Sequence, residues 1–134
     1  PLLAKDYALA VQAENAVREA AGRPPLPLDE TLTEALEVSP RNLIQPTHWP
    51  NIDLLGAQLN LYWAEFQVPV WRMNLRSWPL WDALTNALTN ERVVDDYDII
   101  ILDTPPALGY LTINALAAAD ILLVPLGASF LDVW

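Results

Sequence analysis

Residues 97–125 read YDIIILDTPPALGYLTINALAAADILLVP. The unbroken apolar run at 99–102 is rich in β-branched residues, which is typical of a strand covered on both faces of a parallel sheet. After a proline-containing loop, the sequence predicts a short helix with Thr112 as its N-cap, ending at Ala118. The apolar run at 121–125 predicts a second buried strand. Strand, loop, helix and strand in this order indicate a βαβ unit.

Asp103 is the candidate site residue because it directly follows the first of these apolar runs. Open α/β sheets bind ligands at the carboxyl ends of their strands. A carboxylate at that position suits a hydrated Mg²⁺ ion, which prefers oxygen ligands and keeps its waters, as in a Walker B site. Taken alone, four apolar residues followed by Asp fit a strand-terminal cap or turn equally well.

The first half of the chain reads as helices separated by proline-rich loops. Apolar residues at helical spacing predict a helix over residues 7–21, with Asp6 as N-cap and Gly22 just beyond its end. The prolines at 24, 25 and 27 forbid continuation. A second, short helix is expected from the N-cap Asp29 to Leu36.

The middle of the chain is less regular. Residues 51–57 predict a short strand, and residues 58–73 fit either one helix or two, because Pro69 interrupts the apolar pattern. A further amphipathic helix is expected from the N-cap Ser77, with Pro79 in its first turn. The side chains of Trp63, Trp78 and Trp81 are predicted to face the core.

The composition favours a folded, acidic protein that does not itself bind nucleic acid. Seven Lys and Arg against 17 Asp and Glu give a formal net charge of −10, which repels a phosphate backbone. The chain has no cysteine, which excludes disulfides, thiolate metal sites and a cysteine nucleophile. No apolar run reaches the roughly 18 residues of a membrane span, so we expect a cytoplasmic protein that contacts no membrane.

Residues 96–120 strongly resemble the Walker B and switch II region of the ParA family of partition ATPases. They follow the pattern YD-apolar-D-x-PP-x-LG-x-LT-x-NAL, and the family's AAD and Val-Pro reappear at 118–120 and 124–125. Leu131-Asp132-Val133 is most similar to the RepA-type branch of plasmid-partition ATPases. Upstream, residues 31–36 and 51–57 resemble the family's TLxEAL and NLDLIPA segments, with Gly where the second usually has Pro. Residues 1–28, a helix and a proline-rich loop, stay unassigned.

The resemblance implies roles for a few residues. Asp103 would bind Mg²⁺ through a water molecule, while the switch loop that senses the γ-phosphate of ATP would contain Thr104, Pro105, Pro106 and Gly109. Pro125 would close the next strand near the nucleotide and the dimer interface. The aspartate that follows the family's second strand is not identifiable, so no residue is assigned as the catalytic base.

One departure from the family concerns the phosphate-binding loop, because the sequence has no glycine-rich loop followed by Lys and Ser or Thr. The resemblance therefore implies an α/β fold that is part of a P-loop NTPase parallel sheet flanked by helices, with the first strand and the phosphate loop missing. Since the chain starts at Pro1 without Met and ends on an apolar stretch, we expect an internal piece of a longer protein, folded as one domain over residues 1–134. Such a piece would expose two apolar sheet edges and self-associate.

The function implied by the resemblance is ATP-dependent segregation of plasmid or chromosomal DNA. The intact protein would be an ATPase that uses ATP and Mg²⁺, form a homodimer, bind a ParB- or RepB-like centromere-binding partner, and contact DNA non-specifically through regions outside this chain. The chain alone is expected to be inactive and to bind neither ATP nor Mg²⁺ tightly. Two alternatives remain open: a MinD-like ATPase, and a non-catalytic interaction domain that has lost its phosphate loop.

Overall fold

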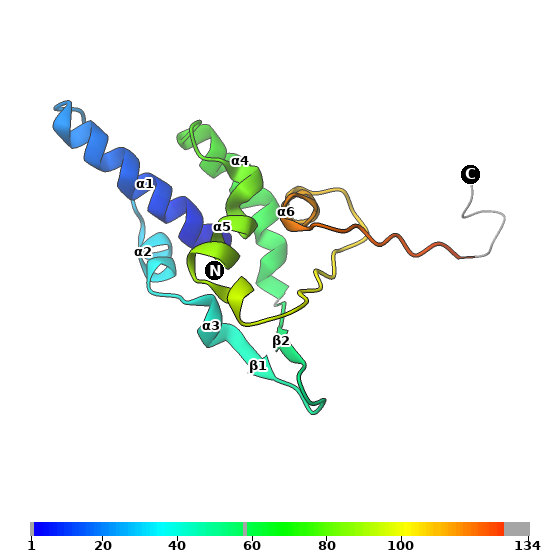
Figure 1. The fold of residues 1–134 in the computed structure, drawn as a ribbon. Helices are drawn as coiled ribbons and strands as arrows, with labels where there is room; N and C mark the ends of the chain where they lie inside the picture. The colour runs from blue at the N-terminus through cyan, green and yellow to red at the C-terminus, as the bar shows by residue number, and fades with distance from the viewer. Residues whose placement is uncertain (1, 58, 128–134) are drawn as a thin grey trace.

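The computed structural model describes residues 2–57 and 59–127 of a mixed α/β protein (Figure 1). In chain order the elements are α1 (Leu2–Ala20), α2 (Glu30–Leu36), α3 (Pro40–Leu43), β1 (Ile44–Pro46), β2 (Asp53–Leu55), the 3₁₀ helix η1 (Leu59–Trp63), α4 (Ala64–Asn74), the 3₁₀ helix η2 (Leu80–Asp82), α5 (Ala83–Asn90), the 3₁₀ helix η3 (Val93–Asp95) and α6 (Tyr110–Ala118).

The hydrophobic core lies where α1, α4 and the segment before η2 meet. Tyr7 and Val11, one turn apart on α1, are both buried and pack with Val68 of α4. The ring of Tyr7 stacks on Trp71 with centroids 5.1 Å apart and meets the edge of Trp78 at 5.0 Å. Offset-stacked and edge-to-face pairs are the favoured aromatic geometries, so this cluster fixes α1 against α4.

Helix α1 starts earlier than the sequence suggests, at Leu2. Asp6 therefore lies inside the helix, and the prediction that it is the N-cap is wrong. Its carboxylate instead accepts hydrogen bonds from Trp78 Nε1 at 2.7 Å and Asn86 Nδ2 at 3.2 Å. The end of the helix agrees with the prediction, because Gly22 has a φ of +66°, the left-handed conformation that glycine adopts after a helix.

The N-cap predicted at Asp29 is confirmed, since its Oδ1 accepts the backbone N–H of Leu32 at 2.9 Å. In contrast, the helix expected from Ser77 begins later. The backbone at Pro79 has a ψ of 68°, outside the helical range, so only the 3₁₀ turn η2 precedes α5, which runs from Ala83 to Asn90.

Helix α4 is continuous across Pro69, which settles the choice left open by the sequence. Proline lacks the N–H that would bond to the carbonyl of residue 65, yet the helix continues, with Ala64 and Val68 buried one turn apart in the turn before Pro69. Of the three tryptophans expected in the core, Trp78 is 1% exposed, whereas Trp63 and Trp81 are 62% and 45% exposed, so the prediction is correct for Trp78 alone.

The strand predicted within residues 51–57 forms as β2, which pairs antiparallel with β1, with Ile44 opposite Leu55 and Pro46 opposite Asp53. This two-stranded hairpin is the only sheet among the described residues. The phenol of Tyr97 donates a hydrogen bond to Asp53 Oδ2 at 2.8 Å. This bond links the hairpin to the segment before residue 99.

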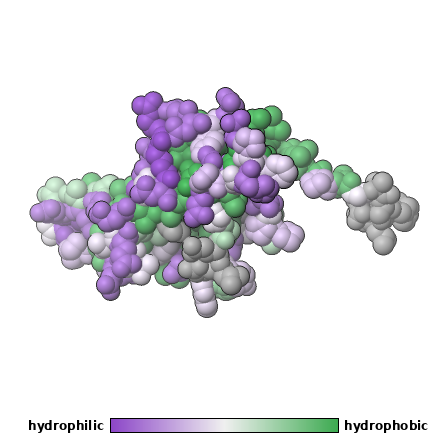
Figure 2. Space-filling model, turned by 90° about the horizontal axis from the view of Figure 1, so that it is seen from below, coloured by the Kyte–Doolittle hydropathy of each residue, from purple (hydrophilic) through white to green (hydrophobic). Residues whose placement is uncertain are grey.

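The βαβ unit predicted over 97–125 forms only in its helix, α6. The two apolar runs that flank α6 are extended but pair with no strand of the described chain, so Ile101 is 86% exposed and Leu123 is 87% exposed. Figure 2 shows the second run projecting from the body of the molecule towards the residues drawn in grey. A parallel strand needs hydrogen-bonding neighbours on its edges, and none of the described segments takes that place.

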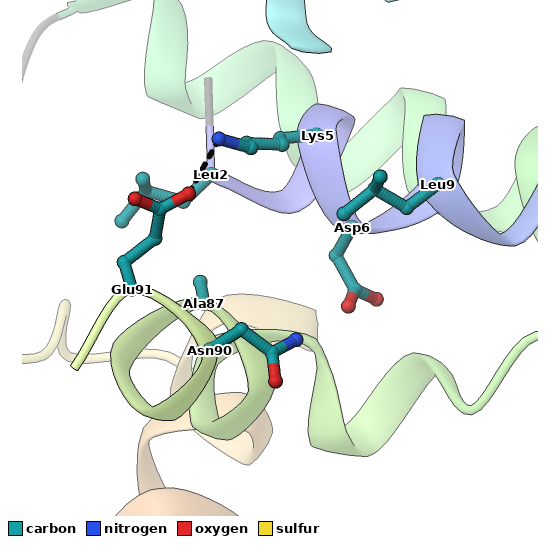
Figure 3. A pocket seen from close by; sticks show the side chains of 7 residues that line it. All are labelled: Leu2, Lys5, Asp6, Leu9, Ala87, Asn90 and Glu91. Carbon is teal, nitrogen blue, oxygen red and sulfur yellow. Dashed lines mark hydrogen bonds and ion pairs between the residues drawn. The ribbon is translucent and has the colours of Figure 1, made fainter. Parts of the chain in front are cut away.

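Two polar networks join distant parts of the chain. The Nζ of Lys5 donates to Glu91 Oε1 at 2.6 Å and to the carbonyl of Val38 at 2.7 Å, at the edge of a small pocket between α1 and α5 (Figure 3). The hydrogen bonds that Glu91 accepts from Lys5 and from Ser39 lower the pKa of its carboxyl group.

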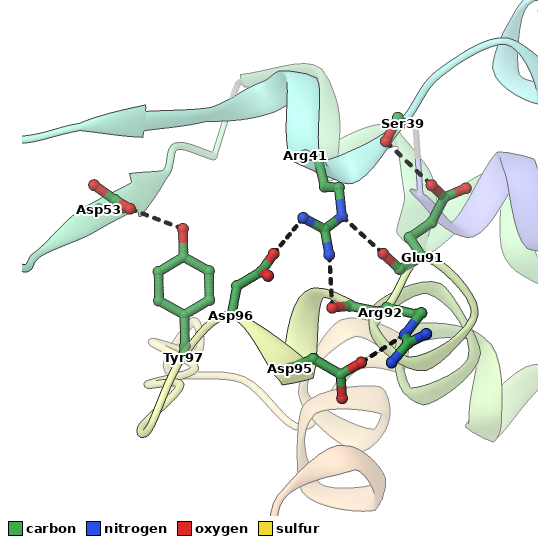
Figure 4. A network of polar contacts seen from close by, with 8 residues as sticks. All are labelled: Ser39, Arg41, Asp53, Glu91, Arg92, Asp95, Asp96 and Tyr97. Atoms are coloured by element: carbon green, nitrogen blue, oxygen red, sulfur yellow. Dashed lines mark hydrogen bonds and ion pairs between the residues drawn. The ribbon is translucent and has the colours of Figure 1, made fainter.

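The second network centres on the guanidinium group of Arg41, which points into the turn after α5 (Figure 4). It donates to the carbonyls of Glu91 and Arg92, both at 2.9 Å, and forms an ion pair with Asp96. Both carbonyls lie just beyond the end of α5, so Arg41 joins α3 to the turn that follows this helix. These contacts also fix the start of the segment that leads to Asp103.

Candidate functional site

Asp103 lies at the end of the first extended apolar run, and its side chain is exposed. It makes no side-chain hydrogen bond to any residue of the part that the structure describes. Thr104, Pro105 and Pro106 follow it and are exposed as well, while Gly109 is half-buried. Four of the predicted site residues and Asp103 thus form one continuous loop, 103–109, in front of α6.

The loop is tied to the helix that follows it. The backbone N–H of Ala107 donates to the carbonyl of Pro105 at 2.7 Å, and the hydroxyl of Thr112 donates to the carbonyl of Ala107 at 2.6 Å. Thr112 is therefore not the N-cap that the sequence suggests. Helix α6 begins three residues earlier than predicted, at Tyr110, with Gly109 at the N-cap position.

The N-terminus of α6 is capped from another helix. Glu65 of α4 accepts the backbone N–H of Tyr110 on Oε2 at 2.8 Å and that of Leu111 on Oε1 at 3.0 Å. A carboxylate satisfies these otherwise unpaired N–H groups and interacts favourably with the positive end of the helix dipole. The sequence offered no signal for Glu65, because no local pattern links residues 45 positions apart.

Asn114, which belongs to the same motif, holds α6 against α5. The residue is 1% exposed, and its side chain bonds both to its own helix and to the first turn of α5. The ring of Tyr110 stacks on Trp81 with centroids 5.7 Å apart. The motif residues of α6 thus position the helix in this structure, a role that sequence reasoning did not assign to Asn114.

Pro125 is not brought to the loop by the described residues. It lies in the exposed extended segment that leads away from α6 (Figure 1). The tripeptide 131–133, quoted above for its resemblance, lies outside the described residues.

The oxygen donors near Asp103 decide whether the loop suits a Mg²⁺ ion. Within residues 2–57 and 59–127, no three His, Asp or Glu side chains gather into a metal-binding cluster. Mg²⁺ is commonly held by one or two carboxylates together with waters and substrate phosphates, and rarely by an all-protein cage. The single exposed carboxylate of Asp103 fits that donor set as one ligand, through a water molecule.

Comparison with known proteins adds independent findings. The family model described as an AAA domain matches residues 10–133. The chain is 37% identical over 89 residues to SopA of Escherichia coli K12, which covers 66% of this chain and 23% of SopA. It is 38% identical over 90 residues to the sporulation initiation inhibitor protein Soj of Bacillus subtilis, covering 66% of this chain and 32% of Soj.

A third relative is the chromosome partitioning protein ParA of Myxococcus xanthus, 38% identical over 90 residues, or 67% of this chain and 29% of ParA. The chain thus spans 23–32% of the length of these three relatives. No solved structure matches it. None of the described helices combines the length and apolar character needed to cross a membrane. Because the family match extends over most of the chain and includes the 103–109 loop and α6, the chain belongs to the ParA family of partition ATPases.

Proposed function

We propose that this chain is part of an ATPase that segregates plasmid or chromosomal DNA. The observation that carries the proposal is the arrangement of the 103–109 loop: an exposed carboxylate at the end of an apolar run, followed by two prolines and a helix whose N-terminus is anchored. In this proposal Asp103 binds Mg²⁺ through water. The loop from Thr104 to Gly109 responds to the γ-phosphate of ATP, and Pro125 lies near the nucleotide and the dimer interface.

In the full-length protein, we place the runs 99–102 and 121–125 in a parallel sheet, on either side of the strand that leads into the phosphate loop. Their exposure in this chain supports this placement, because apolar runs of this kind are stable only when they are paired and covered. The remaining ligands of Mg²⁺ and ATP then come from that strand and its loop.

The proposed partners follow from the family and from the charge of the chain. We propose a cytoplasmic homodimer that is stimulated by a ParB-like centromere-binding protein. Its contacts with DNA are assigned to regions outside this chain, because a net charge of −10 opposes binding to phosphates. A MinD-like role at a membrane is less well supported, since the double proline after Asp103 favours the partition branch.

A second candidate function is a non-catalytic interaction domain. It is favoured by an exposed apolar face on η1 and α4, where Tyr62, Phe66 and Val70 recur at intervals of four residues and are each more than half exposed. Such a face suits a protein partner whether or not the protein binds ATP. The two candidates differ in whether the full-length protein binds nucleotide.

Calorimetry of Mg-ATP binding by the full-length protein distinguishes them. We expect binding that Asp103→Ala weakens by about tenfold or more, equivalent to roughly 1.4 kcal/mol. The matched control is Asp98→Ala, which removes an exposed carboxylate five positions earlier and should leave the affinity within about twofold. Absence of Mg-ATP binding by the full-length protein would contradict the ATPase proposal and favour the interaction domain instead.

A further inference from the structure

The N-terminus of α6 is capped by a residue of another helix. Helix N-termini are commonly capped by the side chain that immediately precedes the first turn. Here the N-cap residue is Gly109, which has no side chain, and the nearby hydroxyl of Thr112 is directed to the carbonyl of Ala107. The first two N–H groups of α6 are bound instead by Glu65, 45 and 46 positions earlier in the chain. The start of α6 therefore depends on α4.

Glycine is needed at position 109 because the Glu65 carboxylate occupies the space that a Cβ atom would need. The backbone conformation at this position does not require glycine, since its φ is −103°. A Cβ atom added at Gly109 would lie 2.6 Å from Oε1 of Glu65 and 2.7 Å from its Cδ. Contacts that short force a shift. The glycine of the loop and the glutamate of α4 thus form one packed unit, in which any side chain at 109 displaces the carboxylate.

The same unit determines the position of the loop. From the anchored N-terminus, the bond between Thr112 and Ala107 and the bond between Ala107 and Pro105 lead back to two successive prolines, whose φ angles are restricted. Asp103 is separated from this tied segment by Thr104 alone. A displacement of the start of α6 is therefore transmitted to the carboxylate that the proposed function assigns to Mg²⁺.

We propose that Glu65 is a positioning residue: its carboxylate, bound to the N–H groups of Tyr110 and Leu111, holds the 103–109 loop in the place required for ATP hydrolysis. This inference rests on the proposed function. In this proposal Glu65 acts through the Tyr110 and Leu111 amides that it binds, so its loss should affect the geometry of the transition state more than the binding of ATP in the ground state.

The first test needs no nucleotide. In hydrogen exchange on the full-length protein, Glu65→Ala should accelerate exchange of the Tyr110 and Leu111 amides by about tenfold or more, because both lose their acceptor. The matched control is Gln67→Ala on the same helix, whose side chain is exposed and should leave both rates unchanged. Equal exchange in Glu65→Ala and in the unmodified protein would overturn the inference, whatever the ATPase activity.

The second test is steady-state ATPase kinetics of the full-length protein. We expect Glu65→Ala to lower kcat by about tenfold with KM within about twofold, and Glu65→Gln, which keeps one acceptor oxygen, to restore part of the loss. A stabilising role alone would lower Tm in both variants and leave kcat per folded molecule unchanged. That result would also overturn the inference.

A double-mutant cycle tests the unit formed by Glu65 and Gly109. Gly109→Ala alone should lower kcat as Glu65→Ala does, because its Cβ displaces the carboxylate. Added to Glu65→Ala, it should have little further effect, since the group that it clashes with is gone. Additive losses contradict the inference. A protein without any ATPase activity removes the proposed function and the positioning role with it, while the exchange experiment still reports on the anchor.

Discussion

Asn114 joins two helices through one side chain: its Oδ1 accepts the backbone N–H of Leu84 at 3.2 Å, and its Nδ2 donates to the carbonyl of Tyr110 at 3.0 Å. The first bond satisfies an N–H group in the first turn of α5, which has no partner within that helix. The second fixes the rotamer that makes the first possible. Asn114 thus sets how α6, and the loop before it, lie against α5.

Asn114→Ala should destabilise the chain by about 2 kcal/mol, because leaving a buried polar group unpaired costs roughly 1–3 kcal/mol. Urea denaturation followed by far-UV circular dichroism measures the change. Asn90→Ala, at the exposed end of α5, provides the control and should change stability by less than about 0.5 kcal/mol. Equal effects of the two substitutions would show that the Asn114 bridge contributes nothing.

Trp78→Ala should be the most damaging single truncation in the core, at about 3–5 kcal/mol, since it leaves a large cavity. The side chain is 1% exposed, contacts Tyr7 and Trp71, and donates its N–H to Asp6. Thermal unfolding of this variant should be compared with that of Trp49→Ala, whose side chain is 60% exposed and should matter little. Similar Tm values for the two variants would contradict the packing described above.

Asp6 should make the free energy of unfolding increase as the pH falls, which is the opposite of the usual behaviour of a carboxyl group in a folded protein. Burial raises the pKa of its carboxyl group and Asp82 raises it further, against the hydrogen bonds from Trp78 and Asn86, which lower it. An acid with a raised pKa in the folded state favours folding when it is protonated. Its contribution to the free energy of unfolding therefore rises as the pH falls through the raised pKa.

The comparison with Asp6→Asn isolates this effect. Between pH 7 and about 4, near the pKa of an unperturbed Asp, the unmodified chain should gain Tm relative to Asp6→Asn as the pH falls. Glu91→Gln gives a control of opposite sign at lower pH: because the pKa of Glu91 is lowered from its ordinary value of 4.5, its contribution is retained down to about that pH and lost below it. A Tm difference for Asp6→Asn that is constant, or that runs in the direction of Glu91→Gln, would falsify the assignment.

The exposed apolar runs should make the 134-residue chain self-associate. Ile101 and Leu123 are among its most exposed apolar side chains, and the backbone next to them, which pairs with none of the described segments, offers an edge to a second chain. Light scattering should show a larger mass than one chain, and Ile101→Lys with Leu123→Lys should reduce it. Met73→Lys, which changes an apolar residue on α4 that is 77% exposed, should not reduce it. A chain that is monomeric without these substitutions contradicts the expectation.

Membership of the family, the length of α1 to within a few residues, the cap at Asp29 and the end at Gly22 were all predictable from the sequence. The helical features among these depend on residues within about four positions of one another, the range at which hydrogen bonding, capping and backbone preference act. The family is recognised from the longer motif over residues 96–120. The 103–109 loop also follows from its motif, since Asp, two prolines and glycine in that order leave few alternatives for the chain.

Other features could not be predicted because they depend on residues brought together by packing. Glu65 reaches Tyr110 across 45 positions, and Asn114 reaches Leu84 across 30. Two of the incorrect predictions have the same cause. Asp6 is of a residue type that often caps helices, but it lies inside a helix and binds Trp78. Trp63 has the spacing of a core-facing helical residue, but its side chain is exposed. Local pattern decides which segments are helical, while burial decides which face is covered.

The apolar runs around α6 show the same division most clearly. Their composition marks them as strands, yet a strand exists only when a neighbouring backbone accepts and donates its hydrogen bonds. Residues 99–102 and 121–125 have no such neighbour among the described segments, and they stay extended and exposed. Amino-acid composition thus determines what these runs can become, and tertiary contacts determine whether they do, because a sheet is a property of several segments together.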